Sequence, residues 1–212
     1  MPSSRDTHET FLQNHMVYDN KIPMKKRAFT EIVVSDFDKI NVLSKSHLCA
    51  GMNRNEVQSV APYFIAYQLA PGTNIYEEGD VEAFLCLIVS GSVNVCKDSG
   101  LPSEQVIITL GPGETVGEVS VIDEQPRSAS VASNTEAVLY ALTRRNLVEM
   151  YGSSLPLWSK LIFNITLSLC SRLRHTNDML LDALSGGITS ESLSGALPSL
   201  RVQSPSFLKT NG

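Results

Sequence analysis

The spacing of apolar positions divides the chain into a helical beginning, a strand-rich centre and a helical end. Residues 31–48 carry apolar side chains at mixed helical spacing, and Asn53 with Glu56 three residues later has the pattern of a capping box. We therefore expect one helix over 31–48 and a second that begins after Asn53 and ends near Pro62. Residues 1–30 show no sustained period, which predicts a flexible extension.

The centre of the chain, residues 63–142, breaks into short β-rich runs separated by glycine and proline. The expected strands are 64–69, 74–76, 84–90, 92–97, 105–110, 129–132 and 137–143. Many short strands joined by tight turns predict an all-β sandwich or barrel.

A long helix is expected after the strands. Ser153 or Ser154 can cap it, Pro156 suits its first turn, and the apolar spacing carries it to about Leu184. Two apolar stripes run along it, so one stripe can pack on the β domain and the other on a partner helix. The first stripe comprises Trp158, Leu161, Ile165, Leu169, Arg172, Thr176, Met179 and Ala183, and the second Ile162, Phe163, Leu167, Cys170 and Leu173. Residues 185–212 are rich in Ser, Gly and Pro, which predicts a disordered tail.

Composition narrows the class of protein. A length of 212 residues with 42% hydrophobic content fits one core with tails. The net charge of −5 argues against a general nucleic-acid binder. The apolar runs are too short to span a bilayer, the N-terminus lacks a signal core, and the four cysteines are scattered without metal-ligand spacing. These features favour a cytoplasmic protein with reduced thiols, no membrane segment and no metal.

The candidate chemistry lies in residues 117–130, which read GEVSVIDEQPRSAS. The Glu118 carboxylate can accept a hydrogen bond from a ribose hydroxyl, and the Arg127 guanidinium can fork onto phosphate oxygens. If a short helix starts at Glu118, its free backbone N–H groups also point at the anion. The alternative is a structural Glu–Arg pair beside a loop.

This stretch resembles the phosphate-binding cassette of the cyclic-nucleotide-binding family, which includes the catabolite activator and the regulatory subunits of cAMP-dependent protein kinase. The turn signals at 71–72, 77–80, 89–93 and 110–113 also resemble those of that family's β-roll, in the same order. The resemblance covers about residues 36–183 and departs at Val116, where the family usually has a larger residue.

The resemblance implies a mainly β fold, a jelly-roll-like β-roll with flanking helices, followed by a long C-terminal dimerisation helix. We divide the chain into a flexible extension at 1–30, a cyclic-nucleotide-binding domain at 31–152, the long helix at 153–184 and a disordered tail at 185–212.

The resemblance also implies roles for individual residues. Glu118 would bind the ribose 2′-hydroxyl, and Arg127 the cyclic phosphate with help from Ser128. The cassette positions assigned to the ligand are Gly117, Glu118, Val119, Ser120, Arg127, Ser128 and Ala129. Thr176 and Asn177 are similar to a base-contacting pair in the activator's dimer helix, with Thr176 acting in its own subunit and Asn177 across the dimer. The candidate apolar walls for the purine are Val95, Ile107 and Leu110.

The expected function is that of a sensor without catalytic residues, cofactor or metal. By resemblance Ser128 favours cAMP, while cGMP, cyclic di-GMP and a ligand-independent scaffold with a vestigial pocket stay open. Residues 185–212 are too few and too polar for a helix-turn-helix domain, so we expect no direct DNA binding. The output would then pass through a homodimer helix at 153–184 to an unknown protein partner. A cupin-like metalloenzyme is disfavoured because no histidine lies in the β region.

Overall fold

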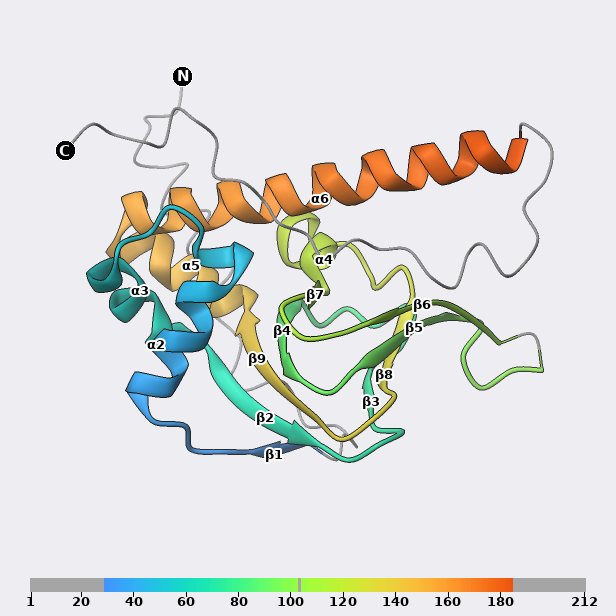
Figure 1. Cartoon of the computed structure of the whole chain (residues 1–212), viewed down its shortest axis with the longest axis horizontal. Helices are drawn as coiled ribbons and strands as arrows, with labels where there is room; N and C mark the ends of the chain where they lie inside the picture. The colour runs from blue at the N-terminus through green and yellow to red at the C-terminus, as the bar shows by residue number, and fades with distance from the viewer. Residues whose placement is uncertain (1–28, 103, 185–212) are drawn as a thin grey trace, which may run out of the picture.

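The structure is a computed structural model that describes residues 29–102 and 104–184 (Figure 1). The predicted disordered tail at 185–212 and nearly all of the predicted extension at 1–30 lie outside the described residues.

The described chain folds into two antiparallel sheets with helices at one side and a long helix across the top (Figure 1). Its elements are β1 (Phe29–Glu31), α2 (Asp36–Lys45), η1 (His47–Cys49), α3 (Arg54–Val60), η2 (Ala61–Tyr63), β2 (Ile65–Leu69), β3 (Asn74–Tyr76), β4 (Phe84–Ser90), β5 (Val93–Lys97), β6 (Gln105–Leu110), β7 (Thr115–Val116), α4 (Glu118–Asp123), β8 (Ser130–Ser133), β9 (Ala137–Thr143), α5 (Arg144–Ser153) and α6 (Leu155–Leu184).

The two sheets form a β-roll. One sheet has the strand order β1-β2-β9-β4-β7, and the other has the order β3-β8-β5-β6. Buried side chains from both sheets, among them Ile75, Phe84 and Leu139, fill the interior of the roll. A second cluster, which includes Leu43 and Tyr140, joins the outer side of the first sheet to the helices. The predicted mainly β fold with flanking helices and a long C-terminal helix is confirmed.

The N-terminal helices are set by their caps. Asn53 accepts from the backbone N–H of Glu56, and Glu56 accepts from the backbone N–H of Asn53, so the predicted capping box is confirmed. The Ser35 side chain caps α2 by accepting from the amide of Asp38.

Two sequence predictions need correction in this part of the chain. Phe29 and Thr30, expected in the flexible extension, pair with β2 as strand β1. The helix expected over 31–48 occupies only Asp36–Lys45, because the cap at Ser35 fixes its start.

The third correction concerns α5, which the sequence analysis did not predict. Thr143, the last residue of β9, accepts from the amide of Asn146 and so starts α5 directly at the end of the strand. Ser153 therefore ends α5. Ser154 lies directly before α6, which begins at Leu155, and its carbonyl accepts from the amide of Trp158, so the predicted start at Ser154 with Pro156 in the first turn is confirmed.

Helix α6 runs across the whole molecule (Figure 1). Along its length it contacts α5, η1 and α4. Leu161 and Ile165 of the first predicted stripe are fully buried against the domain. The Asn164 amide also donates to the carbonyls of Leu48 and Ala50, at 2.8 and 2.9 Å, which fixes η1 against the helix.

Candidate functional site

A glycine turn opens the candidate cassette. Gly117 has a φ of 85° and precedes α4, the six-residue helix Glu118–Asp123. A Cβ at this position would lie 2.5 Å from the Phe84 carbonyl oxygen and 2.6 Å from Nη1 of Arg127. The position therefore needs glycine both for its left-handed backbone and for its close neighbours.

Arg127 lies under this turn, with only 4% of its surface exposed. Its Nη2 donates to the Phe84 carbonyl at 2.7 Å and its Nη1 to the Gly117 carbonyl at 3.1 Å. Nη1 also donates to the Ser120 hydroxyl. The guanidinium carbon lies 3.9 Å from the centre of the Tyr76 ring and 4.5 Å from that of Phe84. Strands β3 and β4 thus hold the cation in place by stacking and by a backbone acceptor.

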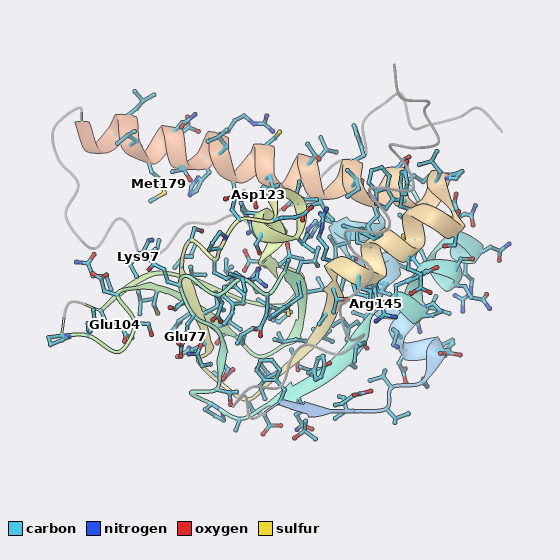
Figure 2. The ribbon with its side chains drawn as sticks, turned by 180° about the vertical axis from the view of Figure 1, so that it is seen from behind. Glu77, Lys97, Glu104, Asp123, Arg145 and Met179 are labelled. Carbon is cyan, nitrogen blue, oxygen red and sulfur yellow. The ribbon has the colours of Figure 1, made fainter. Side chains whose placement is uncertain are left out.

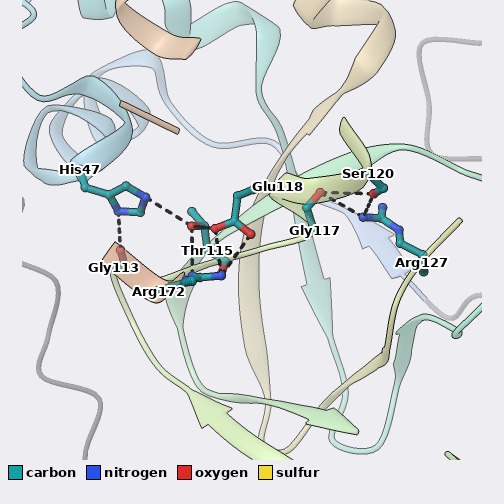
Figure 3. Close-up of polar contacts among 8 residues, drawn as sticks. All are labelled: His47, Gly113, Thr115, Gly117, Glu118, Ser120, Arg127 and Arg172. Atoms are coloured by element: carbon teal, nitrogen blue, oxygen red, sulfur yellow. Dashed lines mark hydrogen bonds and ion pairs between the residues drawn. The ribbon is translucent and has the colours of Figure 1, made fainter. Parts of the chain in front are cut away.

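Glu118 lies on the other side of Gly117 and is 2% exposed (Figure 3). Its carboxylate accepts from the Thr115 hydroxyl and from Nη1 of Arg172, which lies 3.1 and 3.2 Å from the two oxygens. Nη2 of Arg172 donates to the Thr115 carbonyl at 2.5 Å. Because Arg172 belongs to α6, this ion pair joins the long helix directly to the cassette.

His47 of η1 completes the polar network (Figure 3). Its Nδ1 lies 3.3 Å from the Gly113 carbonyl oxygen and its Nε2 lies 3.3 Å from the Thr115 hydroxyl. The pKa of His47 is lowered, chiefly because burial disfavours the charged imidazolium, although the Glu118 carboxylate acts in the opposite direction.

The other predicted cassette residues differ in burial. Ser120 is buried at Arg127, whereas Val119 is half exposed on α4. Ser128 is exposed, and Ala129 is half-buried just before β8. The structure therefore brings Gly117, Ser120 and Arg127 into one group of contacts, with Ser128 beside them in sequence and open to solvent.

The three predicted apolar walls occupy different surroundings. Val95 packs against the cluster inside the roll, and Leu110 is a buried member of it. Ile107 is 55% exposed, because the pairing of β5 with β6 shifts between Val95 and Cys96 and leaves Ile107 unpaired at a bulge. Its neighbour Ile108 packs against the interior cluster instead.

The predicted base-contacting pair lies in the second half of α6. Thr176 and Asn177 are both exposed, and the Thr176 hydroxyl donates to the Arg172 carbonyl one turn earlier at 2.9 Å. Thr176 is thus on the same side of the helix as Arg172. Figure 2 shows Met179 on the side of α6 that faces the roll.

A second side of α6 carries apolar residues that the described chain does not cover. Leu173 is 62% exposed and Leu180 is 56% exposed, and Thr166, Cys170 and Asn177 are also exposed. These five positions follow one another at alternating spacings of four and three residues, the spacing of a coiled-coil seam. We call them the outer seam.

Thr115 and His47 belong to the site although no sequence pattern predicted them, and Arg172 was expected in an apolar stripe of the long helix. A charged residue in an apolar helical stripe was the available signal, because such a residue usually meets a partner of opposite charge. Thr115 and His47 gave no signal of their own.

The geometry thus defines a β-roll with a buried arginine and a buried carboxylate around one glycine turn. Residues 67–154 match the family model described as the cyclic nucleotide-binding domain. This region is a cyclic nucleotide-binding domain, and the chain is similar to catabolite-activator proteins and to cyclic-nucleotide-dependent kinases.

Three comparisons place the chain among its relatives. It is 34% identical over 140 residues to the cyclic AMP receptor protein of Thermus thermophilus, covering 66% of this chain and 62% of that protein. It is 26% identical over 145 residues to a cGMP-dependent protein kinase of Toxoplasma gondii, covering 68% of this chain and 13% of the kinase. A cyclic nucleotide-binding domain from Methylobacillus flagellatus superposes with a TM-score of 0.69 at 26% identity, covering 81% of this chain and 99% of that one. The chain spans less than two thirds of the length of these two sequence relatives.

No helix within 29–184 combines the length and apolar character needed to cross a bilayer. In the same described part of the chain, no group of three or more His, Cys, Asp and Glu side chains could hold a metal ion.

Proposed function

We propose that this chain is a cAMP sensor that binds the nucleotide between the cassette and α6 and relays its occupancy through α6 to a protein partner. The observation that carries the proposal is the placement of buried Glu118 and buried Arg127 on the two sides of Gly117, with Arg172 joining Glu118 to α6.

Arg127 is the phosphate-binding group of this proposal. A planar guanidinium presents its donors in a fork that matches phosphate oxygens. Stacking on Tyr76 and Phe84 keeps the group oriented while a phosphate exchanges for the Ser120 hydroxyl. The amides of Val119 and Ser120 and the exposed hydroxyl of Ser128 complete the subsite.

Glu118 is the ribose-binding group. An ionised carboxylate only accepts hydrogen bonds, and its two oxygens have about four acceptor directions. Thr115 and Arg172 use some of them, which leaves the carboxylate able to accept from a ribose hydroxyl as well. A ligand at Glu118 then contacts the group that holds α6, so its binding biases the position of that helix.

The base is placed between the roll and α6. The apolar side of the base site comprises Val95, Leu110 and Ile108, which replaces the exposed Ile107. The polar edge comprises Thr176 and Asn177. We favour cAMP because the relative at 34% identity is a cyclic AMP receptor protein. The similarity to a cGMP-dependent protein kinase makes cGMP the second candidate.

A second copy of this chain is the proposed occupant of the outer seam. In a parallel pair of helices, the alternating core positions of the coiled coil would be occupied by Cys170, Leu173, Asn177 and Leu180. A buried Asn at such a position pairs with its counterpart and fixes the register of a dimer. Asn177 would then lie near both bound nucleotides, and a change in the helix pair would be the signal that a protein partner reads.

Equilibrium binding of cAMP to site variants tests the ligand assignment. Arg127→Lys keeps the charge but removes the fork, and Glu118→Gln removes the carboxylate. Each should weaken binding by about 1.5–3 kcal/mol. Arg54→Ala, at an exposed position of α3, is the matched control and should bind as the wild type does. Binding unchanged by Arg127→Lys, in a variant with wild-type circular dichroism, would reject this phosphate site.

Thiol cross-linking tests the dimer. Cys170 is exposed on the outer seam, whereas Cys49, Cys86 and Cys96 are buried. A short bis-maleimide should therefore join two chains through Cys170, and Leu173→Asp should abolish the product by placing two carboxylates in the seam. A sedimenting monomer at micromolar concentration, with no cross-linked product, would reject the dimer and the role of Asn177 across it.

A further inference from the structure

His47 lies at the end of the polar network farthest from Arg127 and is buried at 8% exposure (Figure 3). Its ring contacts two oxygen atoms at once, the Gly113 carbonyl through Nδ1 and the Thr115 hydroxyl through Nε2, each at 3.3 Å. The Thr115 hydroxyl also contacts Oε1 of Glu118. Two segments far apart in sequence, residue 47 and residues 113–118, therefore share the few protons of this network.

The protons of the network can be counted. A carbonyl oxygen only accepts, so Nδ1 of His47 must carry a proton to bond to Gly113. In neutral His47 the Nε2 atom is then a bare acceptor, and the single hydroxyl proton of Thr115 can turn toward it. In the imidazolium form Nε2 carries a proton as well and donates to the hydroxyl oxygen. The hydroxyl proton must then point to Glu118.

We propose that His47 is a positioning residue of the ribose subsite, which makes nucleotide binding depend on its protonation. Neutral His47 competes with Glu118 for the Thr115 hydroxyl proton, which leaves Oε1 more able to accept from the ribose hydroxyl. Protonated His47 commits that proton to Oε1, which occupies one acceptor direction of the carboxylate and weakens its bond to the ribose hydroxyl. This inference rests on the proposed function, because it concerns the same site.

The burial of His47 and the charged groups around it determine the pH at which the ring becomes protonated. Glu118 faces it from α4 and Arg172 from α6, while Lys45 at the end of α2 is exposed. Burial is the largest influence and lowers the pKa of His47 below its usual value of about 6.5, against the smaller opposing effect of Glu118. The neutral, binding-competent form therefore dominates at neutral pH, and affinity should fall on the acid side.

Calorimetric titration with cAMP from about pH 8 to about pH 5, in two buffers of different ionisation enthalpy, tests the inference. The dissociation constant of the wild type should rise about tenfold toward acid pH, the effect of losing one hydrogen bond to a charged group. Binding on the acid side should release protons, because the nucleotide selects neutral His47. A phosphodiester does not titrate in this range, so the protons come from the protein.

Two variants and a control separate this role from a structural one. His47→Gln cannot titrate and Thr115→Val cannot pass the proton, so both should give a flat pH profile. His175→Gln, the matched control on α6, should keep the wild-type slope. By reciprocity, saturating cAMP should lower the pKa of the His47 ring by the logarithm of the fold change in the cAMP dissociation constant. Nuclear magnetic resonance of the ring measures this pKa.

The outcomes distinguish the two proposals. Nucleotide binding with a flat wild-type profile, or a His47→Gln variant that keeps the slope, would overturn the role of His47 and leave the proposed function intact. Absence of binding to cAMP, cGMP and cyclic di-GMP at every pH would overturn the proposed function and this inference with it.

Discussion

The ion pair between Glu118 and Arg172 should stabilise the attachment of α6 to the roll, and a double-mutant cycle measures by how much. We consider Arg172→Met, which keeps the aliphatic length, Glu118→Gln, which keeps the shape, and the double variant. The Glu118 carboxylate is almost completely buried, whereas a quarter of the Arg172 side chain is exposed. The two single variants should therefore differ in cost.

The expected magnitudes follow from this asymmetry. Removal of one partner from a fully buried pair costs about 3–5 kcal/mol, because the remaining charge is left without compensation. In Arg172→Met the Thr115 hydroxyl still contacts the carboxylate, so we expect about 2–3 kcal/mol. In Glu118→Gln the freed guanidinium can reach water, so we expect about 1–2 kcal/mol. The double variant should cost less than the sum, with a coupling energy of about 1–2 kcal/mol.

Urea unfolding followed by circular dichroism gives the four free energies of unfolding. A matched control is Arg174→Met, an exposed arginine two residues along α6, which should change stability by less than about 0.5 kcal/mol. The claim that this pair holds α6 to the cassette would be refuted if Arg172→Met were as stable as the wild type. It would also be refuted if the stability losses of the two single variants added up to that of the double variant.

Three further changes test the fold around the site. Gly91→Ala should cost about 3 kcal/mol or more of unfolding free energy, because its Cβ would lie 2.1 Å from the Glu136 carbonyl oxygen. Gly72 has a similar positive φ but open space around it, so Gly72→Ala should cost only about 1–2 kcal/mol. Asn164→Ala should cost about 2–3 kcal/mol in the same assay, because it leaves the buried Leu48 carbonyl and the half-buried Ala50 carbonyl without their donor. An equal stability of wild type and variant would show that water replaces the amide. Without nucleotide, the free energy of unfolding should fall as the pH drops below about 6.5, because the pKa of His47 is lowered in the folded chain and the unfolded chain therefore binds more protons at these pH values. Urea titrations at several pH values measure this slope, and His47→Gln should remove part of it.

Local patterns were enough to predict much of the fold. The glycine and proline turns separated the strands of the roll, and the Asn53 capping box located α3. Helix α5 escaped prediction because its cap, Thr143, is also the last residue of strand β9. Strand β1 escaped because a three-residue strand depends on its pairing with β2, which lies far along the chain.

The candidate site shows the same limit. The cassette at 117–130 is continuous in sequence, so its motif could be found and its residues named. Thr115 lies only three residues before Glu118, but His47 and Arg172 come from distant segments, and only the folded chain places them at this site. A single bulge in β6 also decided which isoleucine faces the roll, because a shift of one residue reverses the side of a strand.

Calorimetric titration of the intact wild-type protein with cAMP, cGMP and cyclic di-GMP tests the central claim most directly. The account predicts saturable binding of cAMP near one nucleotide per chain, stronger than that of cGMP and of cyclic di-GMP. No measurable binding of any of the three would contradict it, and would mean that the β-roll and α6 form a ligand-independent dimerisation scaffold.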